Sequence, residues 1–213
     1  MTILLTHDDV RSTVDMKDAI AAMETAFREE GEGGTLLPAR INMKAGKGWL
    51  RVGPVALEQS GWSGFKAMNL TPGHGVRYQV HLYKIATGEL LAIMDAQHLT
   101  TLRTGATSAI ATRRLARPGP AVVALLGSSV EARAQLDAMQ EAGYVKSARV
   151  FSPTVANRKK LTDDYRRQFD MNIVDVGSAE NLLVSNHFAW VGLLIFGLPV
   201  TIRFWLKNNG RPE

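Results

Sequence analysis

The chain has 213 residues, 46% of them hydrophobic and 21% charged, which excludes a disordered or fibrous protein and predicts one large or two small globular domains. It contains no cysteine, which excludes disulfide scaffolds, zinc–thiolate and iron–sulfur sites and a cysteine nucleophile, and agrees with a cytoplasmic location. The net charge of +5 is spread evenly, with 14 basic and 11 acidic residues in 1–118 and 11 and 9 in 119–213, so we expect no nucleic-acid partner.

The first half of the chain is expected to form a sheet preceded by one long helix. Apolar residues from Met16 to Phe27 recur with the period of one helix face, and glycines follow from Gly31. Short runs bounded by glycine and proline predict strands at 39–44, 49–52, 64–70, 78–84 and 90–95, the last two joined as a hairpin. A second long helix over 97–115 is rich in small residues and ends at the breaker cluster 117–120, where we place a domain boundary.

Strands and helices alternate after this boundary. Strands are predicted at 121–126, 149–152 and 172–176, with helices between them ending at Glu141 and spanning 155–169. The uninterrupted apolar run 121–126 is typical of a strand buried in a parallel sheet. We therefore predict an α/β fold: an N-terminal mixed or antiparallel sheet domain with a long helix (1–118), a partial Rossmann-like βαβαβ domain (119–180) and a divergent apolar tail (181–213).

A glycine-containing turn joins the first strand of the second domain to its helix. It consists of Gly127, Ser128, Ser129, Val130, Glu131 and Ala132. These residues match the dinucleotide-binding pattern G-x-G-x-x-G/A at two of its three fixed positions, with Ser129 in place of the middle glycine. Backbone N–H groups at the start of the helix would bind the pyrophosphate of a dinucleotide. The alternative is an ordinary strand–helix turn that binds no ligand.

The end of the next strand bears on the choice of cofactor. An NAD site usually places Asp or Glu there to bind the ribose 2′-hydroxyl. This chain has Ser152, Thr154 and Arg158 instead, and hydroxyls with a cation suit a 2′-phosphate better. We therefore expect NADP(H) rather than NAD(H). The alternative is a solvent-exposed helix start that Thr154 caps.

Three segments of the first domain carry a family resemblance: Gly64–Asn69, Thr87–Ala92 and Leu102–Ala109. Together with the turn at Gly127, they resemble the ornithine cyclodeaminase/μ-crystallin family from Leu4 to about Glu180. The resemblance implies a homodimeric enzyme whose sheet domain binds the substrate and whose Rossmann domain binds NAD(P). It also implies hydride transfer between the nicotinamide and the α-carbon of an amino or imino acid, without a metal.

The resemblance also implies roles for individual residues. Arg40, Lys66 and Arg103 would bind the substrate, Lys66 would be catalytic, and Arg103 and Thr107 would contact the cofactor. A guanidinium binds a carboxylate through two hydrogen bonds, and a partly buried lysine can lower its pKa and move a proton. The alternatives are that Arg40 is only an exposed loop residue and that Lys66 extends to solvent from an edge strand.

Two departures from the family affect the expected substrate. Ornithine-specific members place an acidic residue near the position of Arg51 and a bulkier residue near Gly53. Arg51 has the opposite sign, so a substrate with an apolar or acidic side chain fits better than ornithine. We therefore expect an imine reductase or amino-acid dehydrogenase, with ornithine cyclodeaminase as the alternative. His74 and His81 are expected to be turn and strand residues, not metal ligands.

The tail after Glu180 does not resemble the family, and no catalytic aspartate can be assigned. It contains the uncharged apolar run Phe188–Ile202. Three interpretations are open: the gene is truncated or frame-shifted, segment 188–206 anchors the chain in a membrane, or the tail is a helix that covers an open edge of the sheet. A chain that lacks the part of the family that follows Glu180 would be a non-catalytic remnant that binds nucleotide or a partner. This is a further alternative function.

Overall fold

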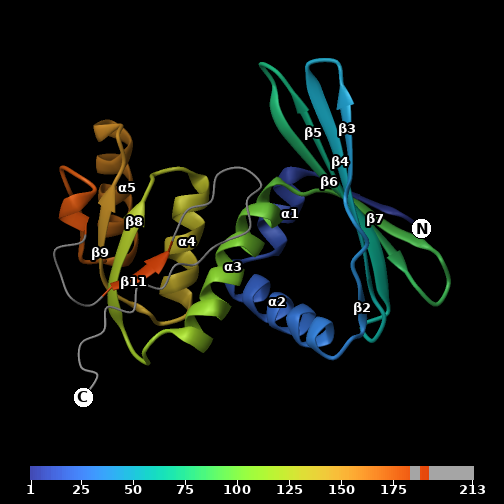
Figure 1. The fold of residues 1–213 in the computed structure, drawn as a ribbon, viewed down its shortest axis with the longest axis horizontal. Helices are drawn as coiled ribbons and strands as arrows, with labels where there is room; N and C mark the ends of the chain where they lie inside the picture. Colours follow the sequence, from blue (N-terminus) through green and yellow to red (C-terminus); the bar gives the residue numbers. More distant parts are fainter. Residues whose placement is uncertain (183–187, 192–213) are drawn as a thin grey trace, which may run out of the picture. The chain divides into compact units, whose positions relative to one another are not determined.

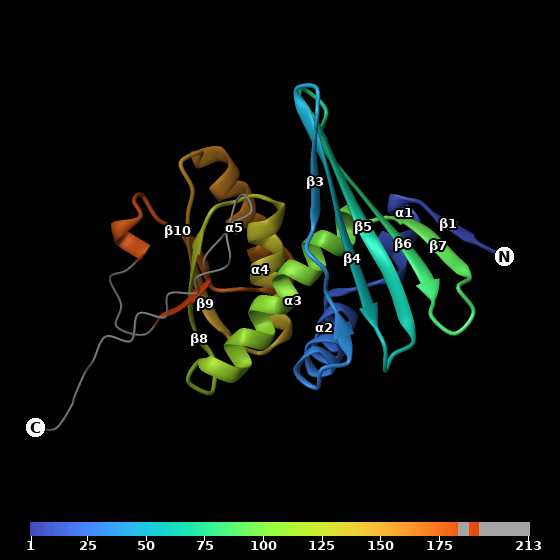
Figure 2. The ribbon, with the colours of Figure 1, turned by 45° about the vertical axis from the view of Figure 1, so that its right-hand side comes forward.

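The computed structural model describes residues 1–182 and 188–191. The chain divides into two compact units, Met1–Thr107 and Ser108–Glu213. The first unit is built on a mixed seven-stranded sheet and the second on a parallel four-stranded sheet, shown in Figures 1 and 2. The predicted domain boundary at residue 118 lies between helix α3 and strand β8, and it stays a prediction.

The first unit contains seven strands and three helical segments. In chain order they are β1 (Ile3–Leu5), α1 (His7–Thr13), α2 (Met16–Gly31), β2 (Thr35–Leu36), β3 (Ile41–Ala45), β4 (Gly48–Leu57), β5 (Trp62–Thr71), β6 (Gly75–Lys84), β7 (Leu90–Asp95) and the first part of α3 (Gln97–Leu115). Both α1 and α2 begin with a capping box, formed by Thr6 with Asp9 and by Asp15 with Asp18. These caps explain why each helix begins where it does.

The order of the first sheet is β1-β7-β6-β5-β4-β2, with β3 also paired to β4. Only β1 runs parallel to its neighbour, and the other pairs are antiparallel. Lys66 lies opposite Gly53 on β4 and opposite Val80 on β6, so these three positions share one face of the sheet. Because the Lys66 side chain contacts Thr100, this is the face on which α3 packs.

A buried carboxylate joins helix α2 to the turn between β4 and β5. Glu29 is 3% exposed and accepts hydrogen bonds from the backbone N–H groups of Gln59, at 2.7 Å, and Ser60, at 3.3 Å. The Ser60 hydroxyl donates to its second oxygen at 2.5 Å. These contacts satisfy a buried charge with several donors and hold the end of α2 against the sheet.

The second unit alternates strands and helices. Its elements are the end of α3, β8 (Ala121–Leu126), α4 (Val130–Glu141), β9 (Val145–Phe151), α5 (Val155–Phe169), β10 (Ile173–Asp175), a 3₁₀ turn (Glu180–Leu182) and β11 (Phe188–Val191). All strand pairs are parallel, in the order β10-β9-β8-β11. This is the strand order of a Rossmann half-domain with the next strand added beside the first. The predicted α/β fold class, a mixed sheet domain followed by a partial Rossmann-like domain, is confirmed.

For residues 188–191, the structure corrects the interpretation of the tail as a helix. Residues 188–191 form strand β11 and pair with β8 from Phe188 opposite Val122 to Val191 opposite Leu125. They are therefore not part of a helix, and they lie at the edge of the sheet opposite to β10. Within the residues that the structure describes, no helix is long and apolar enough to cross a membrane. The rest of the proposed membrane segment, 192–206, lies outside the described residues.

Candidate functional site

Lys66 occupies the centre of the first sheet. Its strand, β5, lies between β4 and β6 and is not an edge strand. The interpretation that Lys66 extends to solvent from an edge strand is therefore wrong. The ammonium nitrogen contacts Thr100 Oγ1 of helix α3 at 2.5 Å and lies 4.7 Å from the centre of the Tyr78 ring. A hydroxyl oxygen and an aromatic face are both favourable neighbours of an ammonium group.

Burial and positive neighbours destabilise the charge on Lys66. Desolvation, followed by the charges of Arg103 and Arg40, lowers the pKa of Lys66 to about 8. Burial, followed by the charge of Arg40, also lowers the pKa of Arg103. The structure therefore brings together the three cations, Arg40, Lys66 and Arg103, for which the family resemblance implies a role in substrate binding.

No carboxylate neutralises this cluster within the described part of the chain. None of the ion pairs of residues 1–182 and 188–191 involves Arg40, Lys66 or Arg103. Three cations held near one another without a counter-ion are electrostatically costly, and an anionic ligand would relieve that cost. The cluster has the charge and the donors needed to bind a carboxylate.

The exposed Arg40 lies against Gly53 of strand β4. A Cβ atom at Gly53 would lie 3.6 Å from Cγ of Arg40, which shows that the arginine stem runs alongside this glycine. Since Gly53 is paired with Lys66, the contact directs Arg40 toward the lysine. The interpretation of Arg40 as only an exposed loop residue is therefore incomplete.

Sequence reasoning missed two neighbours of Lys66, namely Tyr78 and Thr100. Thr100 lies one helical turn before Arg103, so the two share a face of α3, and that spacing was the available signal. Tyr78 lies opposite Met68, two residues along β5 from Lys66, and only the strand register brings it near the lysine. Thr107 lies one turn beyond Arg103, and its hydroxyl donates to the Arg103 carbonyl at 2.8 Å.

In the second unit, the predicted phosphate turn connects β8 to α4. Gly127 has φ +117°, a conformation that favours glycine, and its N–H donates to the Phe151 carbonyl at 2.7 Å. Ser129 caps α4, and its hydroxyl accepts from the N–H of Ala132 at 3.4 Å. Val130, the first residue of α4, is 51% exposed, and the N–H groups of a first helical turn have no partner within the helix.

The side chains of this turn are used within the protein. The Ser128 hydroxyl donates to the hydroxyl of Ser152 at 2.9 Å, which joins the turn to the end of β9. The Ser129 hydroxyl lies 3.2 Å from a carboxylate oxygen of Glu131. Glu131 can therefore contribute its backbone N–H to an anion, while its carboxylate would repel one.

The residues expected to select the cofactor lie at the end of β9. Thr154 is the N-cap residue of α5, as the alternative interpretation expected, but its hydroxyl makes no capping hydrogen bond. Arg158 donates to the Ser152 carbonyl at 3.0 Å and to Asp175 at 3.3 Å, and its side chain is only 11% exposed. Arg158 therefore fixes the loop at the end of β9, and its remaining nitrogen, Nη2, forms no hydrogen bond within the described residues.

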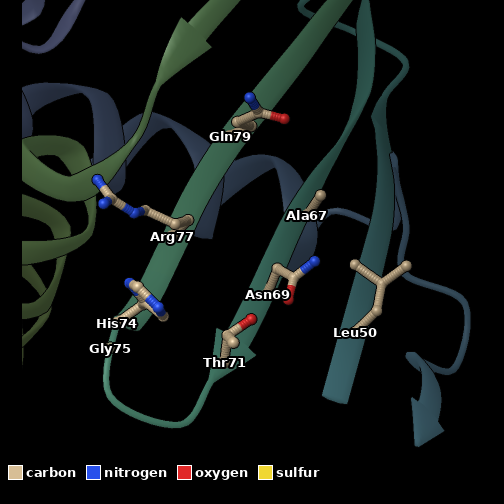
Figure 3. A pocket seen from close by; sticks show the side chains of 8 residues that line it. All are labelled: Leu50, Ala67, Asn69, Thr71, His74, Gly75, Arg77 and Gln79. Atoms are coloured by element: carbon tan, nitrogen blue, oxygen red, sulfur yellow. The ribbon is translucent and has the colours of Figure 1, made fainter. Parts of the chain in front are cut away.

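A pocket of about 460 Å³ opens on the other face of the first sheet (Figure 3). Its lining comprises Leu50, Ala67, Asn69, Thr71, His74, Gly75, Arg77 and Gln79. Ala67 and Gln79 are paired, and their side chains point to the face of the sheet opposite to that of Lys66. This pocket is therefore separate from the cation cluster. His74 lies in the β5–β6 turn and His81 lies in β6, stacked on Phe65 at 4.4 Å, as the sequence predicted.

Comparison with known proteins identifies the family of this chain. The sequence model of the ornithine cyclodeaminase/mu-crystallin family matches residues 1–186, beyond the predicted limit near Glu180. An alanine dehydrogenase of Archaeoglobus fulgidus is 36% identical over 155 residues, which are 68% of this chain and 48% of the relative. The chain spans about half the length of the curated relatives that it matches.

Two solved structures share the fold at 30% sequence identity. The Δ1-pyrroline-2-carboxylate reductase of Thermococcus litoralis, in complex with NADH and L-proline, has a TM-score of 0.78 and is matched over 85% of this chain and 58% of its own. An archaeal alanine dehydrogenase dimer with bound NAD has a TM-score of 0.79, over 85% of this chain and 57% of its own. The sequence match and the fold together show that this chain belongs to the ornithine cyclodeaminase/mu-crystallin family.

Proposed function

We propose that this chain provides the substrate-binding and cofactor-binding parts of an NAD(P)(H)-dependent oxidoreductase that acts on an α-amino or cyclic imino acid. The observation that carries the proposal is the cluster of Arg40, Lys66 and Arg103, which has no carboxylate partner within residues 1–182 and 188–191. A cluster of this kind binds the α-carboxylate that every such substrate carries. Family membership supplies the expected reaction, hydride transfer at the α-carbon.

The three cations have distinct roles in this proposal. Arg103 and Arg40 bind the substrate carboxylate, because guanidinium groups stay charged and can donate two parallel hydrogen bonds. Lys66, with a pKa of about 8, exchanges a proton near neutral pH, and Thr100 Oγ1 orients its ammonium group. When bound, a reduced nicotinamide supplies the hydride that adds to the α-carbon of the C=N bond. The electron pair of that bond moves to nitrogen, which takes the proton that Lys66 holds.

The second unit would bind the cofactor. The backbone N–H groups of Ser128, Ser129, Val130 and Glu131 would hold the pyrophosphate, with Gly127 making the tight turn. We further propose that the cofactor is NADP(H) rather than NAD(H). Two observations support this: residues 152–154 contain no carboxylate, and the Thr154 hydroxyl makes no capping hydrogen bond. Arg158 would add its free Nη2 to a 2′-phosphate while remaining bound to Asp175. A lower dissociation constant for NADPH than for NADH in a fluorescence titration is the expected result.

The surface of the first sheet supports a homodimer as part of the same proposal. Ile41 and Met43 are 57% and 51% exposed, and they lie opposite Val52 and Leu50 on the face that does not contain Lys66. Exposed apolar residues that are contiguous on a sheet face are typical of an interface. One structural relative is a dimer, and we propose that a second copy of this chain covers the face. The cytoplasmic location predicted from the absence of cysteine belongs to this proposal as well.

The reaction class is tested by measuring oxidation of NADPH and NADH by the purified protein with cyclic imino acids. Cofactor oxidation that depends on the imino acid, and is lost in Arg103→Leu, is the expected result. Release of ammonia from ornithine would support the alternative, ornithine cyclodeaminase. Cofactor binding without turnover on any substrate would support the other alternative, a nucleotide-binding protein without catalytic activity.

A further inference from the structure

The face of the sheet that contains Lys66 has more positive charge than one carboxylate needs. Besides Lys66 and the nearby Arg40 and Arg103, the same face contains Arg51 of β4. Arg51 lies opposite Met68, which is two residues from Lys66 on β5. The side chains of Arg51, Met68 and Lys66 therefore point to the same face of the sheet. One α-carboxylate can neutralise only part of this charge.

Arg51 is held in place by two contacts. Its Nε donates to Asn42 Oδ1 at 2.6 Å, and its guanidinium lies 5.1 Å from the centre of the Trp49 ring. Both partners are on the same face, because Asn42 is paired with Arg51 and Trp49 lies two residues before it. These contacts use one of the five N–H donors of the guanidinium, and its two terminal nitrogens form no hydrogen bond within the described residues. The group is therefore ordered and still able to bind a carboxylate.

The spacing between the two positive positions matches a short dicarboxylic acid. Arg51 and Lys66 are diagonal neighbours on adjacent antiparallel strands, about 7–8 Å apart at the backbone. Gly53 lies beside Arg51 on this face and opposite Lys66, and the Arg40 side chain lies over it, with Cγ 3.6 Å from where a Cβ atom of residue 53 would be. Two carboxylates joined by a chain of a few carbon atoms can therefore contact both positions.

We propose that the substrate is a dicarboxylic α-amino or α-imino acid, with its α-carboxylate bound by Arg40, Lys66 and Arg103 and its side-chain carboxylate bound by Arg51. This inference rests on the proposed function, since it specifies the substrate of the same site. A diamino acid such as ornithine is disfavoured, because its distal ammonium would lie beside the Arg51 guanidinium.

The test measures binding of matched carboxylates by isothermal titration calorimetry at neutral pH. L-aspartate and oxaloacetate are compared with L-alanine and pyruvate, each in the presence of NADPH. The proposal predicts that the dicarboxylates bind at least tenfold more tightly. Equal affinity for both classes would overturn it while leaving the proposed function intact. No binding of either class would instead overturn the carboxylate site on which the proposed function rests.

Variants assign the preference to Arg51. Arg51→Gln should remove the dicarboxylate preference and leave the affinity for L-alanine within about twofold of the wild type. Lys44→Gln is the matched control. Lys44 lies on the neighbouring strand β3 and on the same face of the sheet as Arg51, and the substitution also removes one positive charge. An unchanged preference in a folded Arg51→Gln protein would show that Arg51 is only structural. If that variant does not fold, Arg51→Lys replaces it in the test. This variant keeps the positive charge and should retain more than half of the dicarboxylate preference. Complete loss of the preference in Arg51→Lys would contradict the proposal.

Discussion

The ammonium nitrogen of Lys66 and the hydroxyl oxygen of Thr100 lie 2.5 Å apart, which joins the central strand β5 to helix α3. The same hydroxyl lies 2.5 Å from the Ala96 carbonyl, one turn earlier in the helix. Its hydrogen is therefore directed at Ala96, and its lone pairs face the lysine. Thr100 consequently favours the charged form of Lys66, against the effects of burial and of the neighbouring arginines.

We expect Lys66 to lose its proton near pH 8, and we expect Arg103→Met to raise this pKa by removing a positive neighbour. Because the folded pKa lies below the unfolded value of 10.5, the contribution of Lys66 to folding stability should increase as the pH rises from about 8 to 10.5. NMR of ¹³C-methylated lysines measures the pKa, and loss of the resonance in Lys66→Arg assigns it. An unchanged pKa in Arg103→Met would mean that the two charges do not interact.

The turn at Gly127 gives a second prediction. Gly127→Val should abolish NADPH binding and cost about 1–3 kcal/mol of stability, because φ is +117° at this position. Gly143→Val at the opposite end of α4 is the control, since its φ is +76° and the strain is similar. Fluorescence titration should show normal NADPH binding in the control variant. Equal loss of binding in both variants would indicate a general effect of destabilisation.

A partly buried hydrogen bond between α4 and α5 gives a third prediction. The Tyr165 hydroxyl lies 2.5 Å from Asp137 Oδ1 and 3.0 Å from the Arg133 carbonyl, and burial raises the pKa of Asp137. Tyr165→Phe should lower the free energy of unfolding by about 1–3 kcal/mol, because it leaves a partly buried carboxylate with one donor fewer. The loss should be larger at pH 7 than at pH 4, since the ionised carboxylate needs that donor most. Urea unfolding measures both values, and in an Asp137→Asn background the dependence on pH should disappear.

The proposed homodimer gives a fourth prediction. Met43→Glu places a charge on the exposed face of β3 and should convert a dimer into a monomer in sedimentation velocity. Lys44→Glu on the neighbouring position points to the other face and should leave the dimer intact. A monomeric wild-type protein would contradict the proposed interface.

Local sequence patterns predicted most of the elements. Helix α3 and strands β7 and β8 have the predicted bounds, because each coincides with an apolar pattern that ends at glycine, proline or a charged residue. Strand β1 was missed because it is short and gains its stability from pairing with β7, far away in the sequence. Strand β11 was missed for a similar reason, since its pairing with β8 is a long-range contact.

The candidate site, like the fold, could be predicted only in part from the sequence. The family resemblance identified Arg40, Lys66 and Arg103, and the register shows why they meet, since Lys66 is paired with the glycine that Arg40 lies against. The engagement of Arg158 with Asp175 could not be predicted, because the two residues approach only when β9 and β10 pair. Tyr78 could not be predicted either, because only the pairing of β5 with β6 brings it near Lys66, whereas the spacing of Thr100 and Arg103 on α3 was a signal that could have been used.

The most direct test of the proposed hydride transfer uses NADPH labelled with deuterium at the C4 position that donates the hydride. The protein is incubated with this cofactor and a cyclic or dicarboxylic imino acid, and the product is analysed by mass spectrometry. The account predicts an amino acid that carries deuterium on the α-carbon with the wild type, and none with Arg103→Leu. Bound cofactor with no deuterium in any product, or equal labelling by the variant, would contradict it.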